Sequence, residues 1–336
     1  MHCRNCARHE HYNPEKLTGI MPELQVTEAE LRRYHDFVFQ NEIAKTGRRG
    51  SGTLWHYTSG DGLIGILQSG EFWVTQVSCV NDAVELRYAQ AILLRNLKQA
   101  RAESRLPDDE ANLLDRAVLG LSADPTPSSP WFVGCLSEHA DDLSQWRAYG
   151  GGEGGYALAF DTATLHTILH LHQIYLAGVC YDPDVHEDIA RSVVQATLAF
   201  YREGLAARPG ADAAQWAHVF LQAWSNELTY IAPIIKHPAF SAEMEWRLLR
   251  QLREPDLPNL KYRQRQSMMA RHLPLALRLP YAPAGSRLLP ISGVLVGPSR
   301  HKDLSVVSVA TMLRTIGYPE QVYKNVKPSQ VPFQAP

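Results

Sequence analysis

The sequence is poor in the features that mark secreted and membrane-spanning proteins. Only 5 of its 336 residues are cysteines, which is too few for a disulfide framework in a chain of this length. No apolar run approaches the roughly 20 residues that a membrane-spanning helix needs. The first residues, Met1 to Cys6, lack the apolar core of a secretion signal. These absences predict a cytoplasmic protein without a membrane partner.

An excess of either charge is also missing. The chain has 33 lysines and arginines against 35 aspartates and glutamates, a formal net charge of −2. Its overall charge therefore does not favour nucleic acid or an anionic membrane surface. The hydrophobic fraction of 45% and the charged fraction of 20% are ordinary for a globular enzyme or binding protein.

Strand and helix patterns alternate irregularly along the chain. Short apolar stretches with strand character occupy residues 54–58, 72–77, 131–136, 156–160, 174–181, 244–249 and 293–296. Regular β–α–β steps are few, so the pattern predicts an α+β fold rather than a doubly wound sheet.

Local signals place several helices between these strands. Thr27 and Glu30 form a capping box that predicts a helix beginning near residue 27. Apolar residues at helical spacing over 63–67 predict another, which Gly70 would end in the left-handed conformation. Further helices are expected over residues 81–102, 143–149 and most of 185–232.

These patterns suggest a division of the chain into three parts. We expect an irregular leader, a helix and a linker over residues 1–52, and a catalytic-like α+β domain over residues 53–310 with a helical insertion near 185–232. A C-terminal tail would cover residues 311–336. The leader also holds zinc-type residues, spaced too compactly for a usual zinc finger, so metal binding there stays open: Cys3, Cys6, His9 and His11.

The first segment that could carry chemistry is the strand over residues 54–58. Its alternation places His56 and Thr58 on one face and Trp55 and Tyr57 on the other. The helix that follows offers free backbone N–H groups, which suit a phosphate or another anion. The alternative is a buried histidine satisfied by hydrogen bonds.

Two further segments have both structural and functional interpretations. Asn81 or Asp82 can cap a helix while Glu85 reaches back, or Asn81 and Glu85 can line a pocket. Downstream, Trp146 and Tyr149 share a helix face. They form either core packing or a stacking wall for a flat or cationic ring.

Polar residues also end one strand and alternate along another. An apolar strand stops abruptly at Ser137, where strand ends commonly present polar groups to a cleft. Glu243, Glu245 and Arg247 alternate on one face of a late strand. This face is either solvated or brings two carboxylates together on a sugar or a polarised nucleophile.

Together, these segments resemble an uncharacterised bacterial family of the domain-of-unknown-function type, over roughly residues 54–250. The shared pattern consists of Leu-Trp-His-Tyr-Thr at 54–58, Asn-Asp-x-x-Glu at 81–85, Leu-Ser-Glu at 136–138 with Trp146 and Tyr149, and Glu-x-Glu-Trp-Arg at 243–247.

The first block also resembles ADP-ribosyltransferases. In that superfamily, a strand with a His-x-Thr motif runs into a helix ending Ile-Leu-x-x-Gly, and residues 56–58 and 66–70 match this order and spacing. Ser137 and the Glu243-x-Glu245 motif follow in the expected order. The resemblance implies a split-sheet core with helical additions.

The same resemblance implies NAD as the substrate and assigns roles to individual residues. Glu245 would hold the ribose 2′-hydroxyl, His56 the adenosine-side ribose, and Glu243 would orient an acceptor. The remaining residues expected at the NAD site are Tyr57, Thr58 (supporting His56), Asn81, Ser137, and Trp146 or Tyr149 as the ring that stacks on nicotinamide.

The resulting hypothesis is an NAD-consuming ADP-ribosyltransferase-like enzyme or NAD glycohydrolase. It would be a toxin or a phage-defence effector that acts on a protein or nucleic-acid acceptor. One alternative is a non-catalytic module whose His56 pocket binds a nucleotide. The other is a Mg²⁺-dependent nuclease or phosphodiesterase whose oxygen ligands would be Asp82, Glu85, Asp142 and Glu245.

Overall fold

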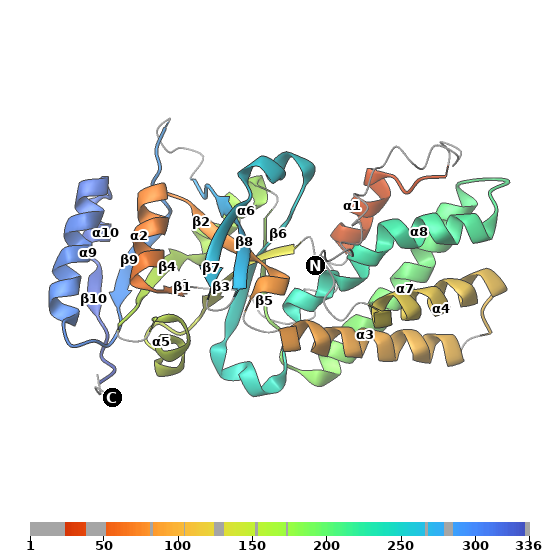
Figure 1. Cartoon of the computed structure of the whole chain (residues 1–336), viewed down its shortest axis with the longest axis horizontal. Helices are drawn as coiled ribbons and strands as arrows, with labels where there is room; N and C mark the ends of the chain where they lie inside the picture. The colour runs from red at the N-terminus through yellow and green to blue at the C-terminus, as the bar shows by residue number, and fades with distance from the viewer. Residues whose placement is uncertain are drawn as a thin grey trace, which may run out of the picture.

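The computed structural model describes most of the chain as an elongated molecule with a sheet half and a helical half (Figure 1). The described residues are 24–37, 52–80, 83–103, 105–123, 131–151, 154–172, 174–265, 268–278 and 285–332. Within them, a ten-stranded and mostly antiparallel sheet combines with helices, which confirms the predicted α+β class.

The sheet has a continuous path of eight strands and a side branch of two. Its order is β10-β9-β4-β1-β3-β2-β8-β7, with β6 on β3 and β5 on β6. Named strand pairs in the described ranges are antiparallel apart from β9 with β10. The strands are β1 (Thr53–Thr58), β2 (Phe72–Gln76), β3 (Trp131–Ser137), β4 (Tyr156–Asp161), β5 (Tyr175–Gly178), β6 (Glu245–Gln251), β7 (Lys261–Arg265), β8 (Met268–Leu275), β9 (Ile291–Val296) and β10 (Val326–Pro328).

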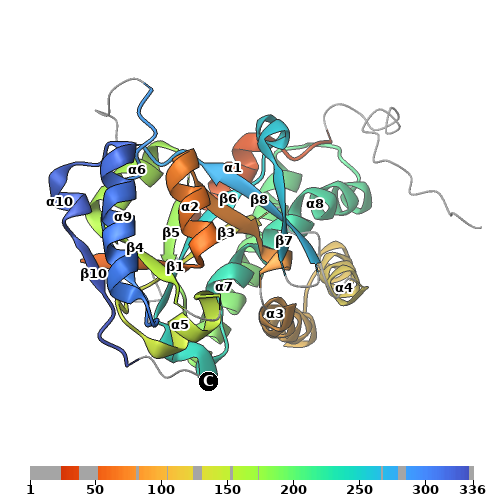
Figure 2. The same cartoon turned by 60° about the vertical axis from the view of Figure 1, so that its left-hand side comes forward.

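One face of the sheet is covered by helices that belong to the sheet half. Their apolar residues join those of β1, β2, β3 and β9 in one core, and Figure 2 shows α2 and α9 in front of the strands. The boundary expected after residue 310 falls inside α9, and β10 extends the sheet beyond it. These helices are α2 (Gly60–Ser69), α6 (Thr162–Leu171), α9 (Lys302–Ile316) and α10 (Glu320–Tyr323).

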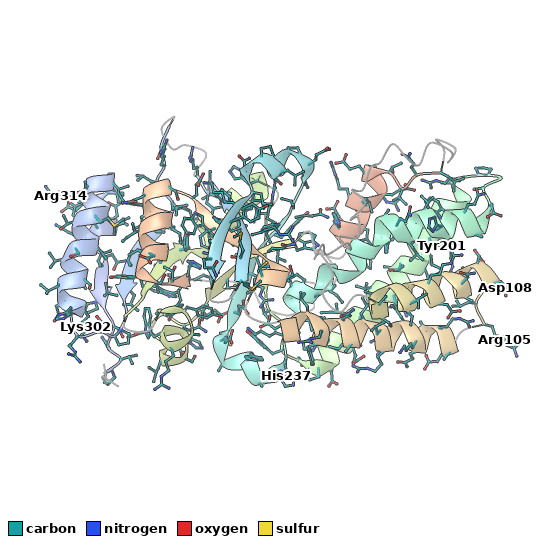
Figure 3. The ribbon with its side chains drawn as sticks, in the orientation of Figure 1. Arg105, Asp108, Tyr201, His237, Lys302 and Arg314 are labelled. Atoms are coloured by element: carbon teal, nitrogen blue, oxygen red, sulfur yellow. The ribbon has the colours of Figure 1, made fainter. Side chains whose placement is uncertain are left out.

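The opposite face carries the helical half at one end and a short helix, α5 (Leu143–Tyr149), at the other. The core of the helical half includes Trp131 and Val133 of β3 and Leu249 of β6, so it packs directly on the sheet. In Figure 3, Arg105 and Asp108 mark its outer tip, and His237 lies at the lower rim between the halves. Its helices are α1 (Glu28–Phe37), α3 (Ala83–Glu103), α4 (Asp108–Ala123), α7 (Pro183–Ala206) and α8 (Ala213–Leu228).

Several local predictions are confirmed. The Thr27 backbone N–H donates to Glu30 Oε2 at 2.7 Å, and the Glu30 N–H donates to Thr27 Oγ1 at 3.2 Å, so the capping box begins α1. Gly70 ends α2 with a φ of 64°. A side chain there would also meet the Arg287 carbonyl oxygen at 1.8 Å. Both the backbone conformation and the lack of space therefore require glycine at this position.

Some expectations lie outside the described residues, namely those on Cys3, Cys6, His9, His11, Asn81 and Asp82. Among the helices that are described, none combines the length and apolarity that crossing a membrane requires.

The sheet forks at β3. One edge of β3 pairs with β6 along its whole length. The other edge is divided, because Trp55 of β1 pairs with Ser137 while Thr75 and Gln76 of β2 pair with the beginning of β3. Beyond these pairs, β1 follows β4 and β2 follows β8, so residues 134–136 of β3 pair with neither strand on that edge.

Candidate functional site

A cavity of about 530 Å³ lies where the sheet forks. Strands β1, β2, β3 and β7 and helix α5 contribute to its wall, and the carboxylates of Glu243 and Glu245 border it. The volume lies within the range typical of small-molecule sites. The fork thus creates the cavity by separating two strands that would otherwise compete for one edge of β3.

His56 reaches this cavity through the fork. Trp55 pairs with Ser137, so alternation puts His56 on the sheet face opposite Glu245, which also pairs with Ser137. Because β1 leaves β3 at this point, the His56 ring fits into the gap, and its Nδ1 lies 2.9 Å from the Cys135 carbonyl oxygen. A carbonyl only accepts, so Nδ1 donates and Nε2 is left as an acceptor.

The ring environment of His56 keeps the imidazole neutral. Burial is the main cause, and the charge of Arg263 adds to it, so the pKa of His56 falls to about 4 against the opposing effect of the Cys135 hydrogen bond. The Phe72 ring packs edge-on against it, with ring centroids 4.7 Å apart. The bond to β3 holds the ring, and Thr58, expected to support it, makes no such bond among the described contacts.

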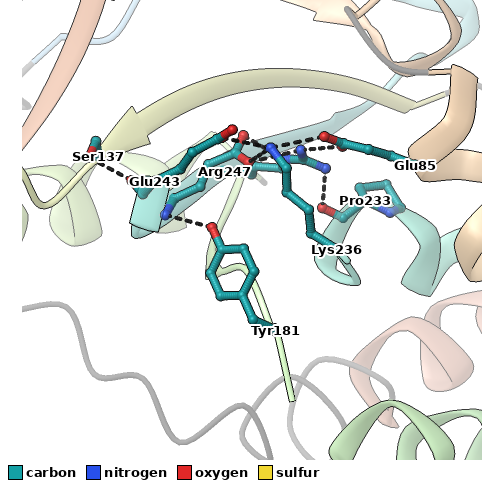
Figure 4. A network of polar contacts seen from close by, with 8 residues as sticks. Glu85, Ser137, Tyr181, Pro233, Lys236, Glu243 and Arg247 are labelled. Carbon is teal, nitrogen blue, oxygen red and sulfur yellow. Dashed lines mark hydrogen bonds and ion pairs between the residues drawn. The ribbon is translucent and has the colours of Figure 1, made fainter. Parts of the chain in front are cut away.

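The carboxylates meet in a group of five charged residues, called here the charge cluster: Glu85, Lys236, Glu243, Glu245 and Arg247. The Lys236 Nζ lies at its centre, 2.9 Å from Glu85, 2.7 Å from Glu243 and 3.0 Å from Glu245. Figure 4 shows Glu85 and Glu243 pointing toward the Lys236 ammonium group from two segments that are far apart in the chain. One lysine thereby joins the helical half to the sheet half.

Arg247 completes the charge cluster from β6. Its Nε donates to Glu245 Oε1 at 2.8 Å, and its Nη2 donates to Glu85 Oε2 at 2.7 Å. Its Nη1 donates to the Pro233 carbonyl at 2.7 Å, also visible in Figure 4. The side chains of Glu245 and Arg247 are 5% and 4% exposed, so the solvated strand face considered as one interpretation of this pattern is wrong.

The two carboxylates nearest the cavity differ in protonation behaviour. Burial alone would raise the pKa of Glu245, but Arg247, Lys236 and a Cys135 hydrogen bond lower it to about 2. Burial raises the pKa of Glu243, against the opposing effect of Lys236. Burial would lower the pKa of Lys236, yet the surrounding carboxylates raise it. The site therefore holds one permanent anion beside a carboxylate that takes up a proton more readily.

The backbone around this pair is not a continuous strand. Glu243 ends a 3₁₀ helix, η6 (Pro238–Glu243), and Met244 adopts the left-handed conformation with a φ of 43° before β6 begins. The Ser137 hydroxyl donates to the Glu243 carbonyl at 2.7 Å, and the Glu245 N–H donates to the Tyr181 hydroxyl at 3.0 Å. Strand alternation was thus the wrong reason for pairing the two glutamates, and Lys236 is what joins them.

The other expected site residues fall into two groups. Tyr57, Thr58 and Tyr149 line the cavity. Ser137 and Trp146, 3% exposed each, lie beneath its wall. Trp146 packs against Tyr57 with centroids 4.6 Å apart, as in the core-packing interpretation. Of the two aromatic rings considered for stacking, Tyr149 is therefore the one that faces the cavity.

The ligand set expected for Mg²⁺ is not brought together. Asp142 caps α5 by accepting from the Ser144 and Gln145 N–H groups. Glu85 and Glu245 are engaged by Lys236 and Arg247, and Asp82 lies outside the described residues. Among the side chains that are described, no group of three or more histidines, cysteines and carboxylates has the arrangement of a metal site.

Sequence reasoning missed two cations of this site. Lys236 directly follows the apolar run Ile231–Ile235, and a lysine that is buried together with such a run needs a carboxylate partner. Arg263 belongs to the alternating basic pattern of residues 261–265, which is a strand signal that was not used.

Comparison with known proteins gives a family match. The model of a family described as a protein of unknown function (DUF2971) matches residues 145–248. These residues run from α5 to β6 and include Tyr149, Lys236, Glu243, Glu245 and Arg247. No curated protein and no solved structure matches the chain.

Proposed function

We propose that the cavity binds NAD and that the protein cleaves the bond between nicotinamide and ribose, in the manner of ADP-ribosyltransferases. The observation that supports this most is the pairing of Glu245, with a pKa of about 2, and Glu243, with a raised pKa, at one cavity. Two carboxylates with separated pKa values suit the two tasks of glycosidic cleavage, charge stabilisation and proton transfer.

In this mechanism the C–N bond breaks, and its electron pair leaves with nicotinamide, which becomes neutral. The ribose carbon then has oxocarbenium character, and the permanent negative charge of Glu245 stabilises it. Water or an acceptor hydroxyl attacks this carbon, and Glu243 takes up the proton that the attacking group releases. The charge cluster keeps Glu245 ionised throughout, because two cations hold it.

The remaining cavity residues fit the rest of the substrate. Tyr149 presents a ring to the cationic nicotinamide beside these carboxylates. The Nε2 lone pair of His56 is suited to accept a hydrogen bond from a ribose hydroxyl, since Nδ1 is committed to Cys135. The resemblance to ADP-ribosyltransferases implies a split-sheet core and a strand that carries the His-x-Thr motif, and the forked sheet with His56 on β1 supports the proposal on both points.

The test is nicotinamide release from NAD by the purified protein in the presence of a chelator. The variants are Glu245→Gln, Glu243→Gln and His56→Ala, with Glu254→Gln, an exposed carboxylate on the same half, as the matched control. Loss of the anion should lower the rate at least about a hundredfold in Glu245→Gln. Glu243→Gln, at a less buried position, carries the test if Glu245→Gln does not fold.

Other outcomes distinguish the alternatives. NAD binding without release, even with cell lysate as a source of acceptor, would favour a non-catalytic nucleotide-binding module. Release that rises with lysate and yields modified protein or nucleic acid indicates transfer, whereas release that is independent of lysate indicates hydrolysis. Nuclease or phosphodiesterase activity that the chelator abolishes would replace the proposal by the metal-dependent alternative.

A further inference from the structure

The cavity has a second side, across the fork from the charge cluster, and of its residues the proposed function uses only His56. We call its residues the fork residues: His56, Trp73, Thr75 and Arg263. We propose that the fork residues form a subsite for the diphosphate of a nucleotide and that Arg263 is its recognition residue. This proposal rests on the proposed function, because it assigns the phosphate groups of the same substrate.

Contacts with β2 hold the Arg263 side chain in position. Arg263 lies on β7, where it pairs with Ala270 of β8, and its side chain is half-buried at the cavity wall. Its Nη2 donates to Thr75 Oγ1 at 2.6 Å, and its guanidinium carbon lies 5.8 Å from the centroid of the Trp73 ring. Such contacts reduce the rotamer freedom that an arginine loses when it binds an anion.

A close approach to α2 positions the Trp73 ring in turn. A side chain at Gly65 would meet the Trp73 ring at 2.3 Å, so the glycine allows the indole to lie directly against the helix. The Trp73 ring also packs near that of His272, with ring centroids 5.2 Å apart. Arg263 is thus held by a layer of packed side chains rather than by solvent-exposed contacts.

The charges on the two sides of the cavity act on different neighbours. Burial is the main cause of the lowered pKa values of His56 and His272, and Arg263 adds to both, with Lys261 at His272. Burial is also the main cause of the raised pKa of Tyr149, to which Cys135, Glu245 and Glu243 add. One side of the cavity is therefore positive and the other negative. A ligand with a cationic ring and an anionic diphosphate matches this division, since opposite charges face each other at both places.

The beginning of α2 is a weaker anion site than the sequence suggested. Its N–H groups are partly satisfied by Ser59, whose side chain accepts from the Gly62 N–H at 3.3 Å. Asp61 in the first turn also borders the cavity, and its carboxylate repels an anion there. Arg263 has the fork-shaped donors that bind two phosphate oxygens at once, so the diphosphate is assigned to β7 rather than to the helix.

Calorimetric titration with ADP tests the subsite without involving bond cleavage, because ADP has no nicotinamide. Wild type, Arg263→Gln, Arg263→Lys and Arg271→Gln are compared. Arg271 is the matched control: it pairs with Tyr262, so it points to the other face of the same hairpin, and it does not line the cavity. Adenosine and inorganic pyrophosphate serve as partial ligands, and thermal unfolding checks that each variant is folded.

We expect Arg263→Gln to weaken ADP binding at least about tenfold, Arg263→Lys to restore part of it, and Arg271→Gln to behave like wild type. Adenosine binding should be the same in all four proteins. Pyrophosphate that binds as tightly as ADP would mean a general anion site and overturn the nucleotide assignment.

The proposal also falls if wild type does not bind ADP or if Arg263→Gln binds it unchanged. Nicotinamide release that persists in that case leaves the proposed function intact. Conversely, Arg263-dependent ADP binding without any release supports the subsite and rejects the cleavage.

Discussion

Glu245 and His56 are both buried at the same cavity, yet the first stays ionised and the second stays neutral. The pKa of Glu245 is lowered to about 2, and that of His56 to about 4. Both shifts favour the unprotonated form, but only for Glu245 does this mean a retained charge. The difference lies in what each side chain contacts: two cations in one case, a neutral carbonyl and an apolar ring in the other.

This comparison separates two ways of burying an ionisable group. The charge cluster stays ionised because each charge has a partner of opposite sign within 3.0 Å. The imidazole of His56 is neutral instead. Burial disfavours its protonated form, and the nearby positive charge of Arg263 disfavours a second cation. One cavity therefore offers a fixed anion on one side and a neutral hydrogen-bonding ring on the other.

The largest expected effect comes from breaking the charge cluster. Arg247→Met leaves Glu245 and Glu85 with one cation fewer in a buried site, and we expect the free energy of unfolding to fall by about 3–5 kcal/mol. Denaturant titration measures this as a lower midpoint at an unchanged slope.

The matched control is Arg191→Met. Arg191 forms an ion pair with Asp188 in which both side chains are more than half exposed, so its loss should cost less than about 1 kcal/mol. Equal destabilisation by the two substitutions would contradict the view that burial makes the cluster costly to break.

On acidification, His56 and Glu245 should each lower the stability of the fold, but in two different pH ranges. Both groups have a lowered pKa in the folded state, so each stabilises the fold above its unfolded pKa and loses this contribution as the pH falls. For His56 the window runs from 6.5 to about 4, and for Glu245 from 4.5 to about 2. Each contributes on the order of 3 kcal/mol at most.

The measurement is the free energy of unfolding against pH for wild type, His56→Asn and Glu245→Gln. Asn retains a donor for the Cys135 carbonyl but does not titrate, so the curve should flatten in the upper window alone. Glu245→Gln should flatten it in the lower window. Since the pKa values of His186 and His272 are also lowered, part of the upper slope should persist. If the curves of both variants stay parallel to that of wild type, His56 and Glu245 are not the source of the pH dependence of stability.

The smallest expected effect distinguishes the aromatic residues of α5. Tyr149 faces the cavity, so Tyr149→Ala should weaken NAD binding about tenfold while the protein stays folded. Trp146 donates from Nε1 to Asp141 at 2.7 Å beneath the wall. Trp146→Phe should therefore cost about 1 kcal/mol of stability and leave NAD binding unchanged. Calorimetry and thermal unfolding of both variants check this, and the reverse pattern would return the stacking role to Trp146.

Much of the secondary structure could be predicted from the sequence because its signals are local. The capping box at Thr27, the left-handed Gly70 and the short helix over residues 143–149 each depend on neighbouring residues. The strands that carry His56 and Glu245 were predicted within one residue at their first positions. Strands β7 and β8 were not predicted; they form a hairpin with each other, and β8 joins the rest of the sheet through the distant strand β2.

The site itself could be predicted only in part. Its carboxylates were expected together, but for the wrong reason: Glu243 lies outside the strand, after a turn that requires the left-handed Met244. The role of Lys236 was not predicted, because it depends on residues of α3 and β6 that contact Lys236 only in the folded chain. Ser137 and Trp146 were expected to line the cavity but lie beneath its wall. A strand end or a helix face in the sequence does not by itself show which side faces a cavity.

The sequence by itself determined most of the segments that become strands and helices and the residue types they carry, since caps, turns and alternation act over a few positions. Only the tertiary structure decided how these segments meet. Glu85 and Arg247 are 162 positions apart, and their contact depends on how the helical half packs on β3 and β6. The fork at β3 likewise arises from competition between β1 and β2 for one edge. The packing of the two halves and the fork at β3 together determine the protonation states of Glu245 and His56, because the pKa of a buried group is set by the neighbours that folding brings to it.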